Sequence, residues 1–169
     1  MRTIKVIMLS LALAAYPAMS KELPAEIHAK IVQLSKAGDT MADEKNYRAA
    51  IQKYVEALQL LPEPITDWDS CTWLLTAIGD ANFLAHAFQQ AKDALSDAMH
   101  CPGAIGNPFI HMRLGQAQFE LGNMERASDE LARAYLQEGL KIFSDEDPKY
   151  VSFIKSKLRP PPGGWPKGW

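Results

Sequence analysis

The sequence predicts an all-α protein, an α-solenoid in which three helix-turn-helix repeats stack and a terminal helix and a tail follow. Apolar residues recur at helical spacing along most of the chain, and prolines and glycines cluster between these stretches. A pattern of small residues also returns three times. The 169 residues are 47% apolar, which is ample for one packed domain.

The first twenty residues, MRTIKVIMLSLALAAYPAMS, differ from the rest of the chain. Arg2 and Lys5 precede an apolar stretch from Val6 to Ala15, and small residues stand at the third and first positions before Lys21. This pattern is typical of a secretory signal peptide, and the stretch is short for a membrane span. We therefore expect cleavage after residue 20, no stable membrane insertion afterwards, and a periplasmic or secreted protein. A buried first helix of a cytosolic domain is the alternative.

The charge of the remaining chain bears on its partners. Residues 21–169 carry 20 acidic and 16 basic side chains, because Arg2 and Lys5 leave with the first segment, and the net charge is −4. Binding to nucleic acid needs clustered lysine and arginine, and the sequence has no such cluster. We therefore expect no nucleic-acid partner.

Three glycines, Gly38, Gly79 and Gly115, lie inside stretches of helical periodicity, although glycine costs a helix about 1 kcal/mol relative to alanine. Alanine follows each glycine after twelve and nineteen residues, and a large side chain follows after sixteen. The three sets are Ala50, Tyr54 and Ala57; Ala91, Leu95 and Ala98; and Ala127, Leu131 and Ala134. We interpret the glycines as packing residues at points where two helices approach closely.

This pattern resembles the tetratricopeptide repeat, a helix-turn-helix unit of about 34 residues with small residues at places 8, 20 and 27. The copies lie 41 and 36 residues apart, so the extra residues fall in LPEPITDWDS and CPGAIGNP. The resemblance places repeats at about 31–64, 72–105 and 108–141, within a repeat domain spanning 21–158. The stretches GNPFIHMRLGQ and DEDPKY also resemble a group of small exported bacterial repeat proteins.

Seven helices follow from the periodicity and the turn signals. They are expected at about 24–37, 47–61, 68–84, 88–99, 108–121, 124–141 and 148–158. Asn107 before Pro108 is a helix start signal, a capping side chain followed by a proline whose missing N–H is not needed. Asp147 before Pro148 repeats this signal.

The chain end combines a helix with a Pro/Gly/Trp-rich tail. The helix 148–158 is expected to cap the apolar face of the last repeat. The acidic residues 145–147 are interpreted as a solvated start of that helix, where negative charge favours the helix dipole. The tail, 159–169, cannot continue the helix, and its Trp165 and Trp169 either dock on a protein surface or remain loose.

No group of residues indicates catalysis. The sequence contains no phosphate-binding glycine loop and no nucleophile elbow. The four histidines are scattered, and the pair His100 and Cys101 lacks the second ligand pair that a structural metal site needs. We therefore expect no metal, no cofactor and no enzyme activity.

The two cysteines leave two interpretations open. Cys71 lies at the start of the first helix of the second repeat, and Cys101 lies at the end of its second helix. Antiparallel packing brings these ends to the same side, and an oxidising compartment would allow a disulfide. Alternatively, both cysteines are reduced and act as small apolar residues.

In tetratricopeptide proteins the first helices of successive repeats line a concave groove. The resemblance assigns to this partner-binding groove the residues Trp73, Thr76, Asp80, Phe109, Met112, Arg113 and Gln116. Members of the family that grip the C-terminal carboxylate of chaperones use Lys, Asn and Arg at such places, and Asp39 and Asp80 depart from that set. The groove better suits a peptide with apolar anchors and a basic group near Asp80.

The resemblance and the lack of catalytic groups predict a non-catalytic protein-protein interaction module in the bacterial envelope. Its partner would be another protein or a peptide. Two alternatives stay open: an immunity protein against a toxin delivered to the envelope, and a structural adaptor that self-associates through the Pro/Trp tail. The sequence leaves the oligomeric state open.

Overall fold

The protein is a row of helical hairpins in the computed structural model, which describes residues 22–160 and 162–164. The described α-helices are α1 (Ala25–Asp43), α2 (Tyr47–Leu58), α3 (Asp69–Leu84), α4 (Phe88–Ala98), α5 (Pro108–Glu120), α6 (Met124–Glu138) and α7 (Pro148–Lys157). Three short 3-10 helices join them: η1 (Ile65–Asp67), η2 (Ala104–Gly106) and η3 (Gly139–Phe143). The expected signal segment, 1–20, and Trp165 and Trp169 of the tail lie outside the described residues.

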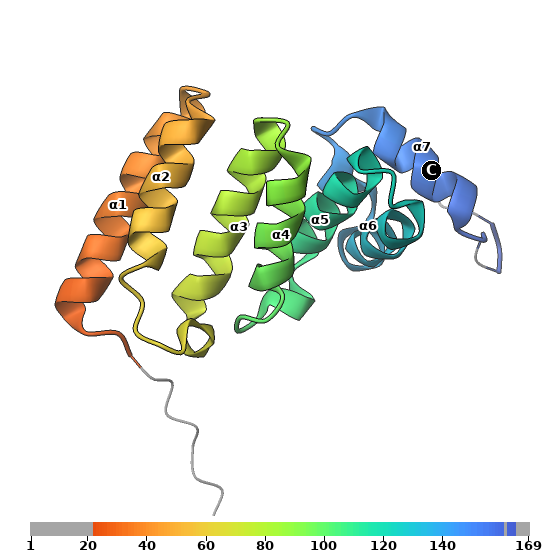
Figure 1. The fold of residues 1–169 in the computed structure, drawn as a ribbon. Helices are drawn as coiled ribbons and strands as arrows, with labels where there is room; N and C mark the ends of the chain where they lie inside the picture. The colour runs from red at the N-terminus through yellow and green to blue at the C-terminus, as the bar shows by residue number, and fades with distance from the viewer. Residues whose placement is uncertain (1–21, 161, 165–169) are drawn as a thin grey trace, which may run out of the picture.

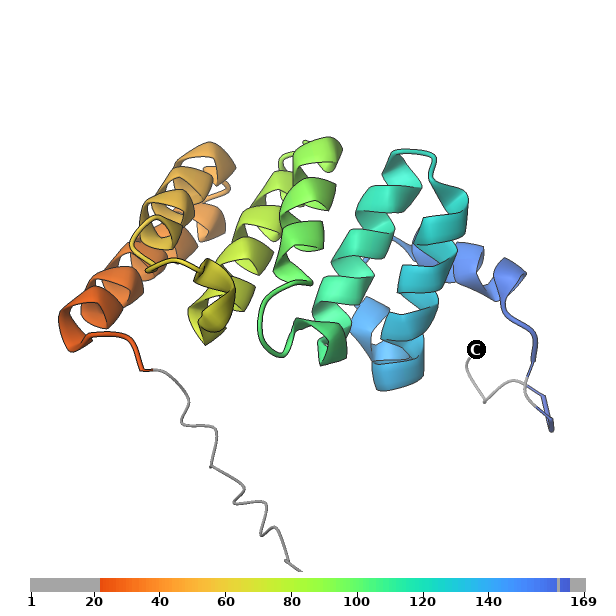
Figure 2. The ribbon, with the colours of Figure 1, turned by 60° about the horizontal axis from the view of Figure 1, so that its bottom comes forward.

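Consecutive helices pair into three hairpins, α1 with α2, α3 with α4 and α5 with α6, and the hairpins stack side by side (Figures 1 and 2). Within the stack α2 packs on α3 and α4 packs on α5, while η3 and α7 close the far end against α6. The described residues contain no strand. This arrangement confirms the predicted all-α solenoid of three hairpins with a terminal helix. None of the helices in the described ranges is long and apolar enough to cross a membrane.

The three helix-internal glycines lie where a large side chain of the partner helix packs closely against them. A Cβ atom built on each glycine would lie 2.5 Å from Tyr54 at Gly38, 2.5 Å from Leu95 at Gly79 and 2.7 Å from Leu131 at Gly115. The alanines of the repeated pattern are completely buried. The glycines are therefore packing residues, and the atoms nearest to them belong to the large side chain sixteen residues later rather than to the small residue twelve later.

Each hairpin turns through one residue in the left-handed conformation. The φ angle is 61° at Lys45, 59° at His86 and 78° at Gly122. The N–H of the following residue then donates to the carbonyl five positions back, from Asn46 to Met41, from Ala87 to Asn82 and from Asn123 to Gln118. This is a common way to end a helix, and it favours glycine at the left-handed position. Only the third repeat has that glycine.

The predicted helix start signals are confirmed, and three predicted ends are corrected. The second helix ends at Leu58 rather than at residue 61. The side chain of Asn107 accepts the N–H of Phe109, and the side chain of Asp147 accepts the N–H of Lys149. The first helix continues to Asp43 rather than ending at residue 37, because Gly38 fits inside the hairpin. The sixth helix ends at Glu138 rather than at residue 141, because Gly139 takes a positive φ of 69° and a 3-10 turn follows.

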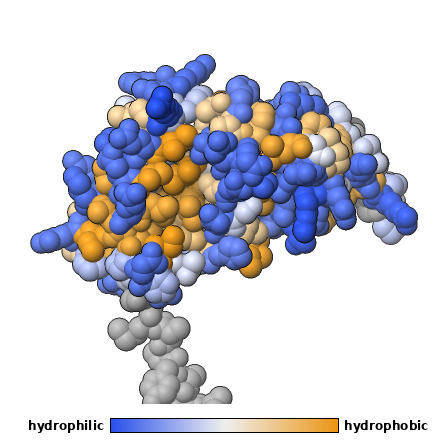
Figure 3. Space-filling view, in the orientation of Figure 1, coloured by the Kyte–Doolittle hydropathy of each residue, from blue (hydrophilic) through white to orange (hydrophobic). Residues whose placement is uncertain are grey.

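The apolar interior forms two clusters. One spans the first two hairpins and the start of α5, and the other joins α5 and α6 to η3 and α7. Apolar side chains also remain partly exposed at the first hairpin, among them Ile27, Leu34 and Ile51. Figure 3 shows hydrophobic surface over this part of the molecule. The second cluster holds α7 against the third hairpin, as expected for a terminal cap.

Candidate functional site

An open hollow of about 250 Å³ lies between α3 and the start of α5. It is lined by Asp69, Thr72, Trp73, Thr76, Ala77, Asp80, Asn107 and Phe109. Four residues that the sequence assigns to the groove therefore lie together, namely Trp73, Thr76, Asp80 and Phe109. Trp73 is 39% exposed, although tryptophan is highly buried on average in folded proteins. A larger hollow, of about 460 Å³, lies near the starts of α1 and α3 and contains none of the predicted site residues.

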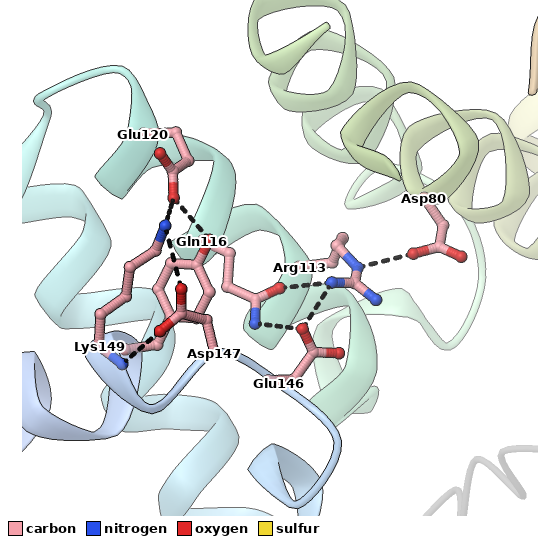
Figure 4. A network of polar contacts seen from close by, with 8 residues as sticks. Asp80, Arg113, Gln116, Glu120, Glu146, Asp147 and Lys149 are labelled. Carbon is pink, nitrogen blue, oxygen red and sulfur yellow. Dashed lines mark hydrogen bonds and ion pairs between the residues drawn. The ribbon is translucent and has the colours of Figure 1, made fainter. Parts of the chain in front are cut away.

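Arg113 lies beside the hollow and is held from three sides (Figure 4). Its Nε lies 2.6 Å from Asp80 Oδ1, and its Nη1 lies 3.0 Å from Glu146 Oε2. The same Nη1 donates to Gln116 Oε1 at 2.7 Å. The guanidinium also lies 4.6 Å from the ring centre of Phe83. Arg113 thus joins the second hairpin, the third hairpin and the segment before α7.

The interpretation of Met112, Arg113 and Gln116 as partner-contacting residues needs correction. The three residues are 2%, 6% and 0% exposed. Met112 belongs to the apolar cluster that includes residues of η3 and α7. Gln116 donates to Glu146 Oε2 at 2.9 Å, so that one carboxylate binds both Arg113 and Gln116. The segment before α7 therefore fills the part of the groove that these residues line.

The acidic segment before α7 also differs from its expected solvated role. Asp147 caps the helix as predicted, whereas Glu146 turns inward to Arg113. Burial raises the pKa of Asp80 above its ordinary value of 3.8, and the nearby Glu146 charge adds to this, although Arg113 opposes both effects. The network therefore holds more carboxylates than one guanidinium balances.

A second set of polar contacts fixes α7 to α5. The Tyr150 hydroxyl donates to Glu120 Oε1 at 2.6 Å, and Lys149 Nζ lies 2.7 Å from the same oxygen. Burial opposes the ionisation of Glu120, but the hydrogen bonds from Lys149 and Tyr150 outweigh it and lower the pKa of this carboxyl. The hydrogen bond to Glu120 raises the pKa of Lys149. These contacts attach the cap rather than form an acid/base pair.

At the other end of the groove, Asp39 accepts a hydrogen bond of 2.8 Å from the Tyr54 hydroxyl. Burial raises the pKa of Tyr54 above its ordinary value of 10.0, and the hydrogen bond and charge of Asp39 add to it. Weaker contributions come from the charges of Asp80 and Asp43. Carboxylates of the first and second hairpins therefore act on the same tyrosine hydroxyl.

Sequence reasoning missed the buried His111. Its Nδ1 lies 2.5 Å from Glu130 Oε2, and its Nε2 lies 2.8 Å from the carbonyl oxygen of Ile105. The residue is 2% exposed, so these contacts tie the η2 segment to α5 and α6. Nothing near His111 in the sequence identifies Glu130, nineteen residues later, as its partner.

The structure joins Cys71 and Cys101 by a disulfide with a Cα–Cα distance of 5.8 Å. The bond connects the first turn of α3 to the segment after α4. A hydrogen bond of 2.6 Å from the Thr72 hydroxyl to the Pro102 carbonyl lies alongside it. No group of three His, Cys, Asp or Glu side chains that could hold a metal ion occurs among the residues that the structure places.

No protein-family model matches the sequence, and a search of curated proteins finds no relative. Solved structures, however, share the fold. The second TPR domain of human RPAP3, solved with the HSP70 peptide SGPTIEEVD, is 17% identical, with a TM-score of 0.60. The match covers 79% of this chain and 99% of that domain.

Two further structures agree. The Arabidopsis OM64 TPR domain is 20% identical over 77% of this chain and 94% of its own, with a TM-score of 0.59. The first TPR of Spaghetti (RPAP3), bound to the HSP90 peptide SRMEEVD, is 19% identical over 76% and 92% of the two chains, with a TM-score of 0.58. Together with the three stacked hairpins, these similarities show that this chain has the tetratricopeptide-repeat fold.

Proposed function

We propose that this chain is a non-catalytic interaction module that binds a segment of a partner protein in the open hollow between α3 and α5. The observation that carries the proposal is the 39% exposed Trp73 in that hollow, beside Phe109 and Asp80. Exposed aromatic residues in a concavity are the usual anchors of protein-protein recognition.

The similar structures support binding rather than catalysis. Two of them were solved with peptides of heat-shock proteins. This chain does not offer the same chemistry, because its buried Arg113 already binds Asp80 and Glu146. The proposed partner is therefore not an acidic chaperone tail.

We further propose that the protein acts in the bacterial envelope. The support is the signal-like pattern of residues 1–20 together with the Cys71–Cys101 disulfide, since disulfides persist mainly in oxidising compartments. Mass analysis of the protein recovered from a periplasmic fraction should give a chain that starts at Lys21. A chain that keeps its first twenty residues and stays in the cytosolic fraction would contradict this location.

The binding proposal is tested by affinity capture from an envelope extract, with the captured proteins identified by mass spectrometry. Wild type should retain a partner that Trp73→Ala loses. Leu136→Ala is the matched control, because Leu136 is 77% exposed on α6, away from the hollow. Capture of the same proteins by wild type and by Trp73→Ala would show that the hollow is not the binding site.

A further inference from the structure

The charged side chains that line the hollow are all acidic. They are Asp69 and Asp80, and no lysine or arginine of the described chain lines it. Asp69 is exposed in the first turn of α3. A ligand in this hollow therefore meets negative charge on the α3 side.

Arg113 does not offset this charge. Its guanidinium is shared between the carboxylates of Asp80 and Glu146, and its side chain is only 7% exposed. One positive charge thus balances one of the two carboxylates. The side-chain charges that line the hollow therefore favour a cation over an anion.

The hydroxyl groups of the hollow act as acceptors. Thr76 donates its hydrogen to the Thr72 carbonyl at 2.6 Å, and Thr72 donates its own to the Pro102 carbonyl at 2.6 Å. Both oxygens keep lone pairs for a ligand, but neither keeps a hydrogen. The side-chain oxygen of Asn107 already accepts the Phe109 N–H. A ligand group that reaches the two threonine hydroxyls must therefore be a hydrogen-bond donor.

We infer that the partner segment carries an arginine, whose guanidinium stacks on Trp73 and donates to the Asp69 carboxylate and the threonine oxygens. This inference rests on the proposed function. Arginine fits better than lysine because its planar group presents five donors and stacks on aromatic faces, whereas an ammonium is a compact point charge. The interior of the same protein shows the geometry, since the Arg113 guanidinium lies over the rings of Phe83 and Phe109 at 4.6 and 5.3 Å.

The experiment is a selection from a phage-displayed library of random dodecapeptides against the full chain, followed by calorimetry with the best synthetic peptide. Arginine should be enriched beside apolar residues in the selected pool. Replacing that arginine by citrulline, which keeps the shape and removes the charge, should weaken binding about tenfold, as expected for a charge-assisted hydrogen bond. Asp69→Asn should weaken the binding of the arginine peptide to a similar degree.

Asp97→Asn is the matched control, because it removes one exposed carboxylate from α4, outside the hollow. It should leave the affinity unchanged, and circular dichroism should show that both variants fold. A pool without arginine enrichment, no enriched peptide at all, or equal binding of the citrulline peptide would overturn the inference.

The outcomes separate this inference from the proposed function. Binding that is lost with Trp73→Ala but is unchanged by Asp69→Asn and by citrulline would overturn the inferred role of arginine. The hollow would then remain the binding site. Peptides that bind Trp73→Ala as well as wild type overturn both.

Discussion

Gly79 shows how a single hydrogen atom in place of a side chain sets the spacing of a hairpin. A Cβ atom at this position would lie 2.5 Å from Leu95 Cγ, which is closer than two non-bonded carbon atoms approach. Gly38 and Gly115 stand in the same relation to Tyr54 and Leu131. The loss of helix propensity at a glycine is thus offset by the large side chain that packs over it.

Gly79→Ala should destabilise the protein. We expect a loss of up to about 2 kcal/mol, since overpacking costs about 1 to 3 kcal/mol and alanine returns about 1 kcal/mol of helix propensity. Urea unfolding measures the difference. The control is Gly106→Ala, where a built Cβ meets no atom within 4 Å. Equal stability of wild type and Gly79→Ala would show that the hairpin has room for a methyl group.

Among the secondary-structure elements, α7 and the segment before it decide which part of the groove is available. Glu146 lies 3.0 Å from Arg113 and accepts a hydrogen bond from Gln116, while Tyr150 and Lys149 bind Glu120. These contacts close the groove over the third hairpin. No segment of the described residues covers the second hairpin in this way, and Trp73 stays exposed.

Glu146→Ala should loosen this attachment. The buried Arg113 and Gln116 lose a shared acceptor, and hydrogen bonds to charged groups contribute about 1.5 to 3 kcal/mol. We expect a loss of that size in urea unfolding, and faster proteolysis between α6 and α7. The neighbouring Asp145→Ala, an exposed residue, should change stability by less than about 0.5 kcal/mol. Equal stability of the two variants would mean that Glu146 does not hold the segment.

The disulfide acts on the second hairpin and its connection. The Cys71–Cys101 bond has a sequence separation of 30 residues, and a bond of that span restricts the unfolded chain. Cys71→Ser combined with Cys101→Ser should lower the unfolding free energy by about 3 to 4 kcal/mol. Thiol labelling of the unfolded, unreduced protein should find no free thiol, whereas two labelled thiols per chain would exclude the bond.

At the scale of the whole molecule, buried tyrosines tie the two ends of the solenoid to acidic partners. Tyr54 donates to Asp39 in the first hairpin, and Tyr150 donates to Glu120 at the cap. Burial, followed by these hydrogen bonds, raises the pKa of both hydroxyls above the ordinary value of 10.0. The unfolded chain therefore releases these protons at a lower pH than the folded chain.

The stabilisation from these two tyrosines should consequently be fully present below pH 10. As the pH rises above 10, the free energy of unfolding should fall by about 1.4 kcal/mol per pH unit for each tyrosine. Urea unfolding between pH 8.5 and about 11 measures the slope. Tyr54→Phe combined with Tyr150→Phe should flatten this fall, and each single variant should remove part of it. An unchanged slope in the double variant would show that other groups cause the alkaline loss.

The sequence by itself determined the hairpins and their order, because helical periodicity, capping pairs such as Asn107–Pro108 and the spacing from Gly115 to Leu131 are local or periodic signals. It also predicted a set of groove residues, and four of them, Trp73, Thr76, Asp80 and Phe109, line one hollow. It did not reveal the left-handed turn at Lys45, since only the equivalent Gly122 is the residue that this conformation favours.

The tertiary structure alone decided which groove residues are open. Arg113 and Gln116 have the same repeat-derived assignment as Trp73, but Glu146, about thirty residues later, covers them. The pairing of His111 with Glu130 is likewise a contact between helices. The physical reason is that the exposure of a side chain depends on what packs over it. The sequence of a segment about thirty residues away contains no periodic pattern that predicts where that segment will pack.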